Sequence, residues 1–123
     1  MTTVLLVAAG SALGAPARYL VDQFVQRRHE RVLPWGTWTI NVSGALLLGL
    51  LIGAAGPLHL DPLLVAAAGT GFLGAYTTFS TFSWETLRLI EERAFRAAVG
   101  NVTLSLLAGA AAVTMGVAIG SAL

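Results

Sequence analysis

The chain is short, apolar and nearly uncharged, and these properties exclude most classes of soluble protein. Its 123 residues suit one domain, and they are 56% hydrophobic and only 11% charged. So few charged side chains cannot cover the surface of a soluble fold. A net charge of +1 and the lack of cysteine argue against nucleic-acid binding and a disulfide scaffold. The composition therefore predicts an integral membrane protein.

Uncharged runs divide the chain into four predicted membrane-spanning helices. An α-helix needs about 20 apolar residues to cross the hydrocarbon core, and its backbone groups are bonded internally, as a lipid environment requires. We therefore expect an all-α protein with a single transmembrane domain, residues 1–123, and a break in the middle of the third helix. The predicted helices cover approximately residues 3–26, 36–55, 62–90 and 96–122.

The arginines indicate one preferred orientation in the membrane. Six of the seven lie at the first and third connections, whereas both termini and the second connection hold none. Because cytoplasmic connections are enriched in basic residues, the first and third connections are expected in the cytoplasm and both termini outside. The six are Arg27, Arg28 and Arg31 at the first connection, and Arg88, Arg93 and Arg96 at the third.

Three spans carry small residues at helical spacing. Such pairs let two helix backbones approach closely in lipid, either within one chain or between subunits. The sequence leaves both possibilities open. The pairs are Gly10 and Gly14, Gly49 and Gly53, and Gly116 and Gly120.

The most unusual segment, Gly71–Ser83, lies in the middle of the third span. Gly71 and Gly74 are followed by five hydroxyl side chains within seven positions, and Phe79 and Phe82 share one helical face. Back-bonding of hydroxyls to carbonyls one turn earlier would explain one or two of them. Five beside a glycine break instead favour an interrupted helix, whose free carbonyls suit a cation and whose free amides suit an anion.

The side chains at this break favour a small anion. Hydroxyl groups and the amide of Asn41, in the second span, can donate hydrogen bonds. Phenylalanine edges carry the positive part of the ring quadrupole. No acidic ring lines the segment, which argues against a carboxylate-lined cation pore.

Three further polar groups lie within or beside the spans, each with two interpretations. Arg18, one turn before Asp22, is either an anion-attracting charge or half of a structural pair. Glu85 is either a helix-end charge or a gate at a vestibule, and Ser105 either bonds to its own backbone or faces the pathway. An ionisable group at membrane depth is a functional candidate by default.

Three segments resemble the signatures of the CrcB/Fluc fluoride channels: residues 14–19, 36–44 and 71–83, in that order along nearly the whole chain. The resemblance implies a fluoride-selective channel in the cell (inner or plasma) membrane, which exports cytoplasmic fluoride passively and lowers its toxicity. It also implies an antiparallel, dual-topology dimer in the lipid bilayer, with two fluoride pathways and a structural sodium ion (Na+) at its centre.

The resemblance also implies a role for each matching residue. Gly74 and Thr77 would offer backbone carbonyls to sodium from both subunits, and Phe79 and Phe82 would turn their ring edges toward fluoride. The rest of the implied fluoride pathway comprises Asn41 as a donor to the ion, Ser80 and Thr81 as a hydroxyl track, Ser105 as a pathway serine, Glu85 as a carboxylate at the end of the pathway, and Arg18 as the arginine of the first helix.

Two residues depart from the family pattern, and the arginine distribution raises a third point. Ala75 stands where a second glycine is usual, and Asn101 stands where a tyrosine is common, so the tyrosine's role is not transferred. An antiparallel homodimer needs both orientations from one sequence, which the arginine bias opposes. The second subunit is expected to be either a second copy or an oppositely oriented paralogue. The bias favours the paralogue as a hypothesis.

Two other functions compete with the channel. A small four-helix multidrug/proton antiporter would need an acidic residue at mid-membrane in the first helix, but Asp22 lies near the end of that helix. A structural assembly subunit held by its glycine pairs would leave the hydroxyl and phenylalanine cluster unexplained. Catalysis is disfavoured, because the sequence lacks cysteine and neither histidine lies in a predicted span.

Overall fold

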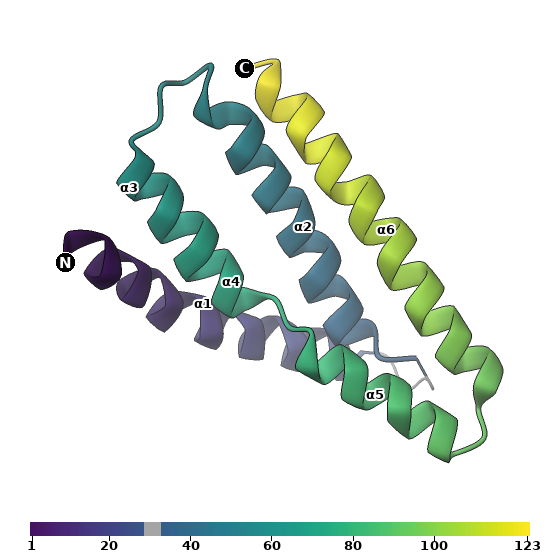
Figure 1. Cartoon of the computed structure of the whole chain (residues 1–123). Helices are drawn as coiled ribbons and strands as arrows, with labels where there is room; N and C mark the ends of the chain where they lie inside the picture. The colour runs from purple at the N-terminus through teal and green to yellow at the C-terminus, as the bar shows by residue number, and fades with distance from the viewer. Residues whose placement is uncertain (29–32) are drawn as a thin grey trace.

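A computed structural model describes residues 1–28 and 33–123 of the chain (Figure 1). Residues 29–32, which include Arg31 of the arginine count, lie outside the described residues. Within the described part, four helical spans are long and apolar enough to cross a membrane: residues 2–26, 35–55, 62–91 and 95–121. Every end lies within one residue of its predicted position. The four predicted spans are confirmed.

The third span is built from several short elements. Asp61 caps its start, because the Asp61 carboxylate accepts a 2.7 Å hydrogen bond from the Leu63 amide and Pro62 occupies the first helical position. The elements in chain order are α1 (Thr2–Gln26), α2 (Trp35–Ala55), α3 (Pro62–Val65), the π-helix η1 (Ala66–Leu73), α4 (Gly74–Tyr76), α5 (Ser80–Glu91) and α6 (Phe95–Ser121).

The predicted break in the third span is confirmed. The helix stops after Tyr76, Thr77 adopts an extended conformation with φ −81° and ψ 164°, and helix resumes at Ser80 (Figure 1). The break follows the glycines by about one turn. Gly71 and Gly74 themselves belong to continuous helical turns, the first of them in the π-helix, a widened form that is frequent at functional sites.

Glycines allow the helices to pack in two close pairs, α2 along α6 and α1 along η1 (Figure 1). A Cβ atom added at Gly116 would lie 2.8 Å from the Leu50 nitrogen of α2, which is closer than real Cβ contacts. A Cβ atom added at Gly10 would lie 2.9 Å from the Phe72 nitrogen of η1. The glycine pairs therefore serve packing within this chain.

A small buried cluster fixes the segment before the break against α2. Ile40 of α2 packs with Leu73 and Tyr76 of the third span, and Ile40 is only 1% exposed. The Tyr76 ring stacks on that of Phe72 with centroids 5.9 Å apart, and the Tyr76 hydroxyl lies 2.9 Å from the Ser43 hydroxyl. The end of α4 is thus held by both packing and a hydrogen bond.

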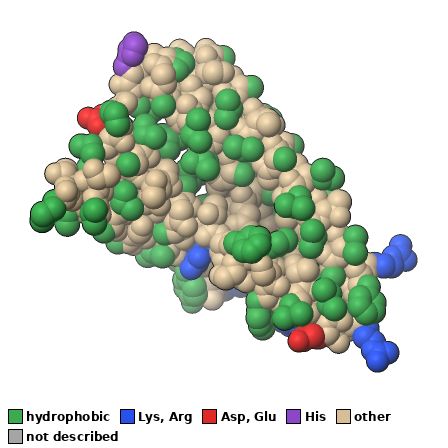
Figure 2. Space-filling model, in the orientation of Figure 1, with side chains coloured by type: hydrophobic (Ala, Val, Ile, Leu, Met, Phe, Trp, Pro, Cys, Tyr) green, Lys and Arg blue, Asp and Glu red, His purple; other side chains and the backbone are tan. Residues whose placement is uncertain are grey.

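The rest of the surface is largely apolar, as a bilayer requires. Large hydrophobic side chains are exposed along every span, and Figure 2 shows them spread over the visible face. Both chain ends and the α2–α3 connection lie toward one end of the molecule, and the α5–α6 connection lies at the other (Figure 1). The α2–α3 and α5–α6 connections therefore lie at opposite ends of the molecule, as the predicted topology requires.

Candidate functional site

Asn41 of α2 holds the break open. Its side-chain nitrogen donates to the Thr78 carbonyl at 2.8 Å, and its side-chain oxygen accepts from the Thr78 amide at 2.9 Å. The Thr78 amide thus bonds to Asn41 instead of continuing the helical ladder to the Gly74 carbonyl. The structure thus places Asn41 at the break. Donation from Asn41 to an ion stays a prediction.

Three hydroxyl groups meet where helix resumes. The Thr78 hydroxyl donates to that of Thr81 at 3.0 Å, and it lies 3.4 Å from the Ser80 hydroxyl. Ser80 and Thr81 are exposed, and Thr78 is half-buried. Thr77 instead makes the back-bond typical of an ordinary helix, from its hydroxyl to the Leu73 carbonyl at 2.9 Å. The hydroxyl groups of Ser80 and Thr81 therefore lie next to that of Thr78, and their role as a track beside an ion stays a prediction.

Phe79 and Phe82 lie together beside this cluster. Their ring centroids are 5.8 Å apart and the ring planes are inclined at 44°. Phe79 is 78% exposed in the single chain, whereas Phe82 is partly buried. The structure brings the two rings together as predicted, with the edges of an exposed ring available to another group.

The two carbonyls assigned to a cation lie on either side of the end of α4. The Gly74 carbonyl lacks its usual helical donor because Asn41 accepts the Thr78 amide, and Gly74 is exposed. The Thr77 carbonyl points out of the ladder and accepts a long, 3.5 Å hydrogen bond from the Arg18 guanidinium of α1. Arg18 therefore reaches the break. No ion pair joins it to Asp22 within 4.0 Å among the described residues.

The break opens onto a groove between α2 and the third span. This groove has a volume of about 370 Å³ and is lined by Asn41, Gly74, Thr77, Thr78 and Phe79, together with apolar residues of α2 and η1. Four of the residues singled out in the sequence therefore line one surface. Residues that carry side-chain donors, carbonyls outside the helical hydrogen-bond pattern and an aromatic ring therefore line the same groove.

Glu85 lies further along α5, next to a different hollow. Its carboxylate accepts a 2.9 Å hydrogen bond from the buried Thr37 hydroxyl, and its other oxygen has no partner among the described residues. Asp22 approaches from α1 and its carboxylate packs against the backbone at Gly36. Glu85 also lines a cavity of about 360 Å³ with Arg88 and Glu92. Glu85 therefore lies between its buried partner Thr37 and the hollow that Arg88 lines.

Sequence reasoning missed the role of Asn101 of α6. This side chain is 3% exposed and donates to the Thr86 hydroxyl at 2.9 Å, which in turn donates to the Phe82 carbonyl at 2.8 Å. The relay links α6 to the α5 turn that carries Phe82. Ser105, one turn further along α6, is half-buried, and the structure does not join it to the other candidate residues. Its pathway role stays a prediction.

Comparison with known proteins finds a family that matches most of the chain. The family described as "CrcB-like protein, Camphor Resistance (CrcB)" matches residues 5–117 of the chain. The matched region begins in α1 and ends in α6, so it includes every candidate residue named above.

Individual relatives are similar over most of their length. A Frankia casuarinae protein named "Fluoride-specific ion channel FluC 1" is 52% identical over 124 residues, which cover 96% of this chain and 95% of the relative. A Streptomyces avermitilis protein of the same name is 53% identical, with 92% and 91% covered. A Mycobacterium tuberculosis protein named "Fluoride-specific ion channel FluC 2" is 49% identical, with 85% and 79% covered.

Proposed function

The chain belongs to the CrcB family, and we propose that it is a fluoride-selective ion channel that exports cytoplasmic fluoride passively across the cell membrane. The names of its relatives support this function. The structural observation that carries the proposal is the open break in the third span. There the Asn41 amide of α2 bonds to a short segment that carries a cluster of hydroxyl groups and an exposed phenylalanine ring.

The break supplies what a small, strongly hydrated anion needs in order to leave water. Hydroxyl groups of Ser80 and Thr81 offer donors at the start of α5, where the first backbone amides also lack helical acceptors. Phe79 and Phe82 add the positive edges of two rings. The acidic side chain nearest in sequence is Glu85, and it bonds to Thr37 instead of joining the cluster. The local chemistry thus favours an anion.

The arginine of α1 is a further feature of the break that favours an anion. Arg18 places a positive charge beside the break, where its guanidinium contacts the Thr77 carbonyl. A fixed positive charge in a region of low dielectric raises the local concentration of anions. In the proposed pathway, Arg18 attracts fluoride and Glu85 lies toward the end of the path. Ser105 contributes a further hydroxyl from α6.

The free carbonyls of the break also fit a structural sodium ion. Hard cations prefer oxygen ligands, and unwound membrane helices often provide them through carbonyls. The Gly74 carbonyl lacks its helical donor, and the Thr77 carbonyl has a lone pair beyond the long contact with Arg18. A bound sodium ion would attract both carbonyl oxygens and so stabilise the backbone at the break. Two carbonyls are too few ligands to bind a sodium ion within one chain. A complete site would therefore need further oxygen ligands from a second subunit.

A second subunit is also favoured by the exposure of the break. Gly74 and Ser80 are exposed in the single chain, and the exposed ring of Phe79 lines the groove at Asn41. Irregular backbone at membrane depth is tolerated only where protein or a water-filled cavity covers it. We propose an antiparallel dimer in which the partner covers this groove. The partner is a second copy or an oppositely oriented paralogue.

Fluoride efflux from liposomes tests the proposed function. Purified protein is reconstituted at low density into vesicles loaded with fluoride or chloride, and an ion-specific electrode records the loss of each. We expect rapid fluoride loss and retained chloride. Equal loss of both halides, or no loss above protein-free vesicles, would contradict the proposal.

Accessibility of a C-terminal tag tests the identity of the partner. The arginine bias predicts that tags on this chain, expressed alone, face outward in most molecules. An even split between the two sides would reject the paralogue and favour a homodimer. Protease protection of the tag in right-side-out and inverted vesicles measures the ratio directly.

A further inference from the structure

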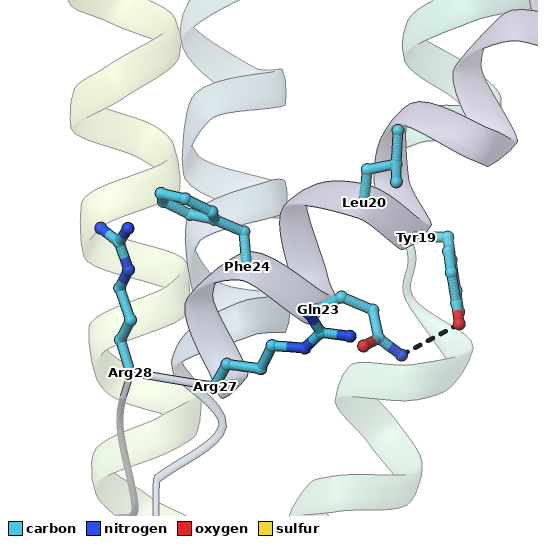
Figure 3. A pocket seen from close by; sticks show the side chains of 6 residues that line it. All are labelled: Tyr19, Leu20, Gln23, Phe24, Arg27 and Arg28. Atoms are coloured by element: carbon cyan, nitrogen blue, oxygen red, sulfur yellow. Dashed lines mark hydrogen bonds between the residues drawn. The ribbon is translucent and has the colours of Figure 1, made fainter.

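A third hollow lies on the outer face of α1, away from the break (Figure 3). It has a volume of about 540 Å³ and is lined by residues of one helical face and the helix end: Tyr19, Leu20, Gln23, Phe24, Arg27 and Arg28. The candidate fluoride pathway uses none of them. Tyr19, Leu20 and Phe24 are each more than half exposed, so the hollow faces the surroundings of the span.

The polar groups of this hollow are predominantly donors. Arg28 stacks over the Phe24 ring at 3.9 Å, which positions its guanidinium at the edge of the hollow (Figure 3). Gln23 donates to the Tyr19 hydroxyl at 3.0 Å, so the hydroxyl hydrogen of Tyr19 stays free to donate elsewhere. Two guanidiniums and a phenol hydroxyl therefore belong to residues that line this hollow.

No carboxylate among the described residues neutralises these arginines. Neither Arg27 nor Arg28 forms an ion pair with a described acidic residue, and no acidic residue is among those that line the hollow. Asp22 is the acidic residue nearest in sequence on α1, but its carboxylate packs against α2 at Gly36. Among the described residues, the hollow thus combines two arginines that have no acidic partner with an apolar floor made by Leu20 and Phe24.

This combination matches the chemistry of an anionic phospholipid. Guanidinium groups bind phosphate oxygens through paired hydrogen bonds, and basic pockets at membrane depth recognise anionic headgroups. An exposed leucine and aromatic rings at the end of a span suit acyl chains and the interface. Fluoride is a poor occupant because the hollow is wide and half apolar. The positive-inside rule also places this end at the cytoplasmic surface.

We propose that the Tyr19–Arg28 face of α1 is a binding site for an anionic phospholipid. The guanidiniums of Arg27 and Arg28 attract the headgroup phosphate, the Tyr19 hydroxyl offers a further donor, and the acyl chains lie along Leu20 and Phe24. The site is independent of fluoride conduction, so the lipid site and the channel can be tested separately.

Lipid titration of the purified, detergent-solubilised protein tests this site. Native mass spectrometry counts bound phosphatidylglycerol and phosphatidylcholine for the parent and three variants. The variants are the pair R27Q/R28Q, the matched control pair R93Q/R96Q at the same end of the molecule, and Phe24→Leu. Because the protein is purified before lipid is added, changes in membrane insertion do not affect the result.

We expect R27Q/R28Q to weaken phosphatidylglycerol binding about tenfold and to leave phosphatidylcholine binding unchanged. The control pair removes the same charge, and we expect a change of less than about twofold from it. Phe24→Leu, which removes the ring under Arg28, should weaken binding about threefold and keeps the test valid if the double variant does not fold. Equal losses in both arginine pairs, or parental binding by R27Q/R28Q, overturn the proposal.

A competition arm separates the lipid from a soluble phosphate ester. Glycerol phosphate carries the same headgroup phosphate without acyl chains, and we expect it to displace phosphatidylglycerol poorly. Displacement at matched concentrations would assign the hollow to a soluble anion and overturn the lipid proposal.

Discussion

Replacing Asn41 with alanine tests how the break is kept open. The substitution removes two half-buried hydrogen bonds, of 2.8 and 2.9 Å, between Asn41 and the Thr78 backbone. The Thr78 amide is then free to bond to the Gly74 carbonyl and extend α4. At a net value of about 1 kcal/mol for each bond, the open form loses about 2 kcal/mol, which is about a thirtyfold change in population.

Fluoride efflux is the assay for this variant. If conduction requires the open break, the initial rate of fluoride loss from liposomes should fall by at least about tenfold for Asn41→Ala. Asn41→Asp keeps the acceptor for the Thr78 amide but loses the donor to its carbonyl, and it places a negative charge beside the anion path. We expect Asn41→Asp to fold as well as the parent and still conduct poorly.

Ser43→Ala is the matched control. Ser43 also lies on α2 and bonds to the third span, at the Tyr76 hydroxyl, but it does not touch the break. We expect its efflux rate to stay within about threefold of the parent, because one hydrogen bond of this kind contributes about 1 kcal/mol to packing. A folded Asn41→Ala protein that conducts at the parental rate would refute the reasoning.

Three further predictions follow from individual contacts. Phe79→Ala should abolish fluoride efflux yet leave thermal stability nearly unchanged, because that ring is 78% exposed; parental efflux would exclude Phe79 from the pathway. Asn101→Ala leaves the Thr86 hydroxyl without its buried donor, so we expect about 1–3 kcal/mol less stability in denaturant titration, and an unchanged midpoint would contradict the relay. Replacing sodium with N-methylglucamine during purification should lower the melting temperature, whereas equal melting in both cations would argue against a sodium site.

The spans were predictable from composition because each boundary is marked by the sequence itself. Charged residues, Pro62 and the glycine of the second connection limit the apolar runs, so the predicted helix ends differ from the observed ones by no more than one residue. These signals are local, and a bilayer imposes the length of each helix. Long-range contacts were not needed to place them.

The details of the break were less predictable, since they depend on residues distant in sequence. The glycines mark where α1 and the third span approach closely, and the helix continues through them with a widened turn. The interruption falls at Thr77 and Thr78, where Asn41 of α2 and Arg18 of α1 bond to the backbone. A pattern within the third span alone cannot locate such partners.

The same limit applies to Asn101. Its sequence position departs from the common family residue, so resemblance offered no role for it. The structure shows a buried amide that reaches Phe82 through Thr86. A polar side chain among the apolar residues of α6 was the only available signal, and it could not reveal the partner on α5.

A reversal-potential measurement tests the central claim most directly, namely that the interrupted third span selects fluoride. Purified protein is inserted into a planar bilayer that separates a fluoride solution from a chloride solution. Each solution also contains a small, known amount of the other halide. We predict that the current reverses at the equilibrium potential of fluoride. Reversal midway between the fluoride and chloride potentials would contradict the account.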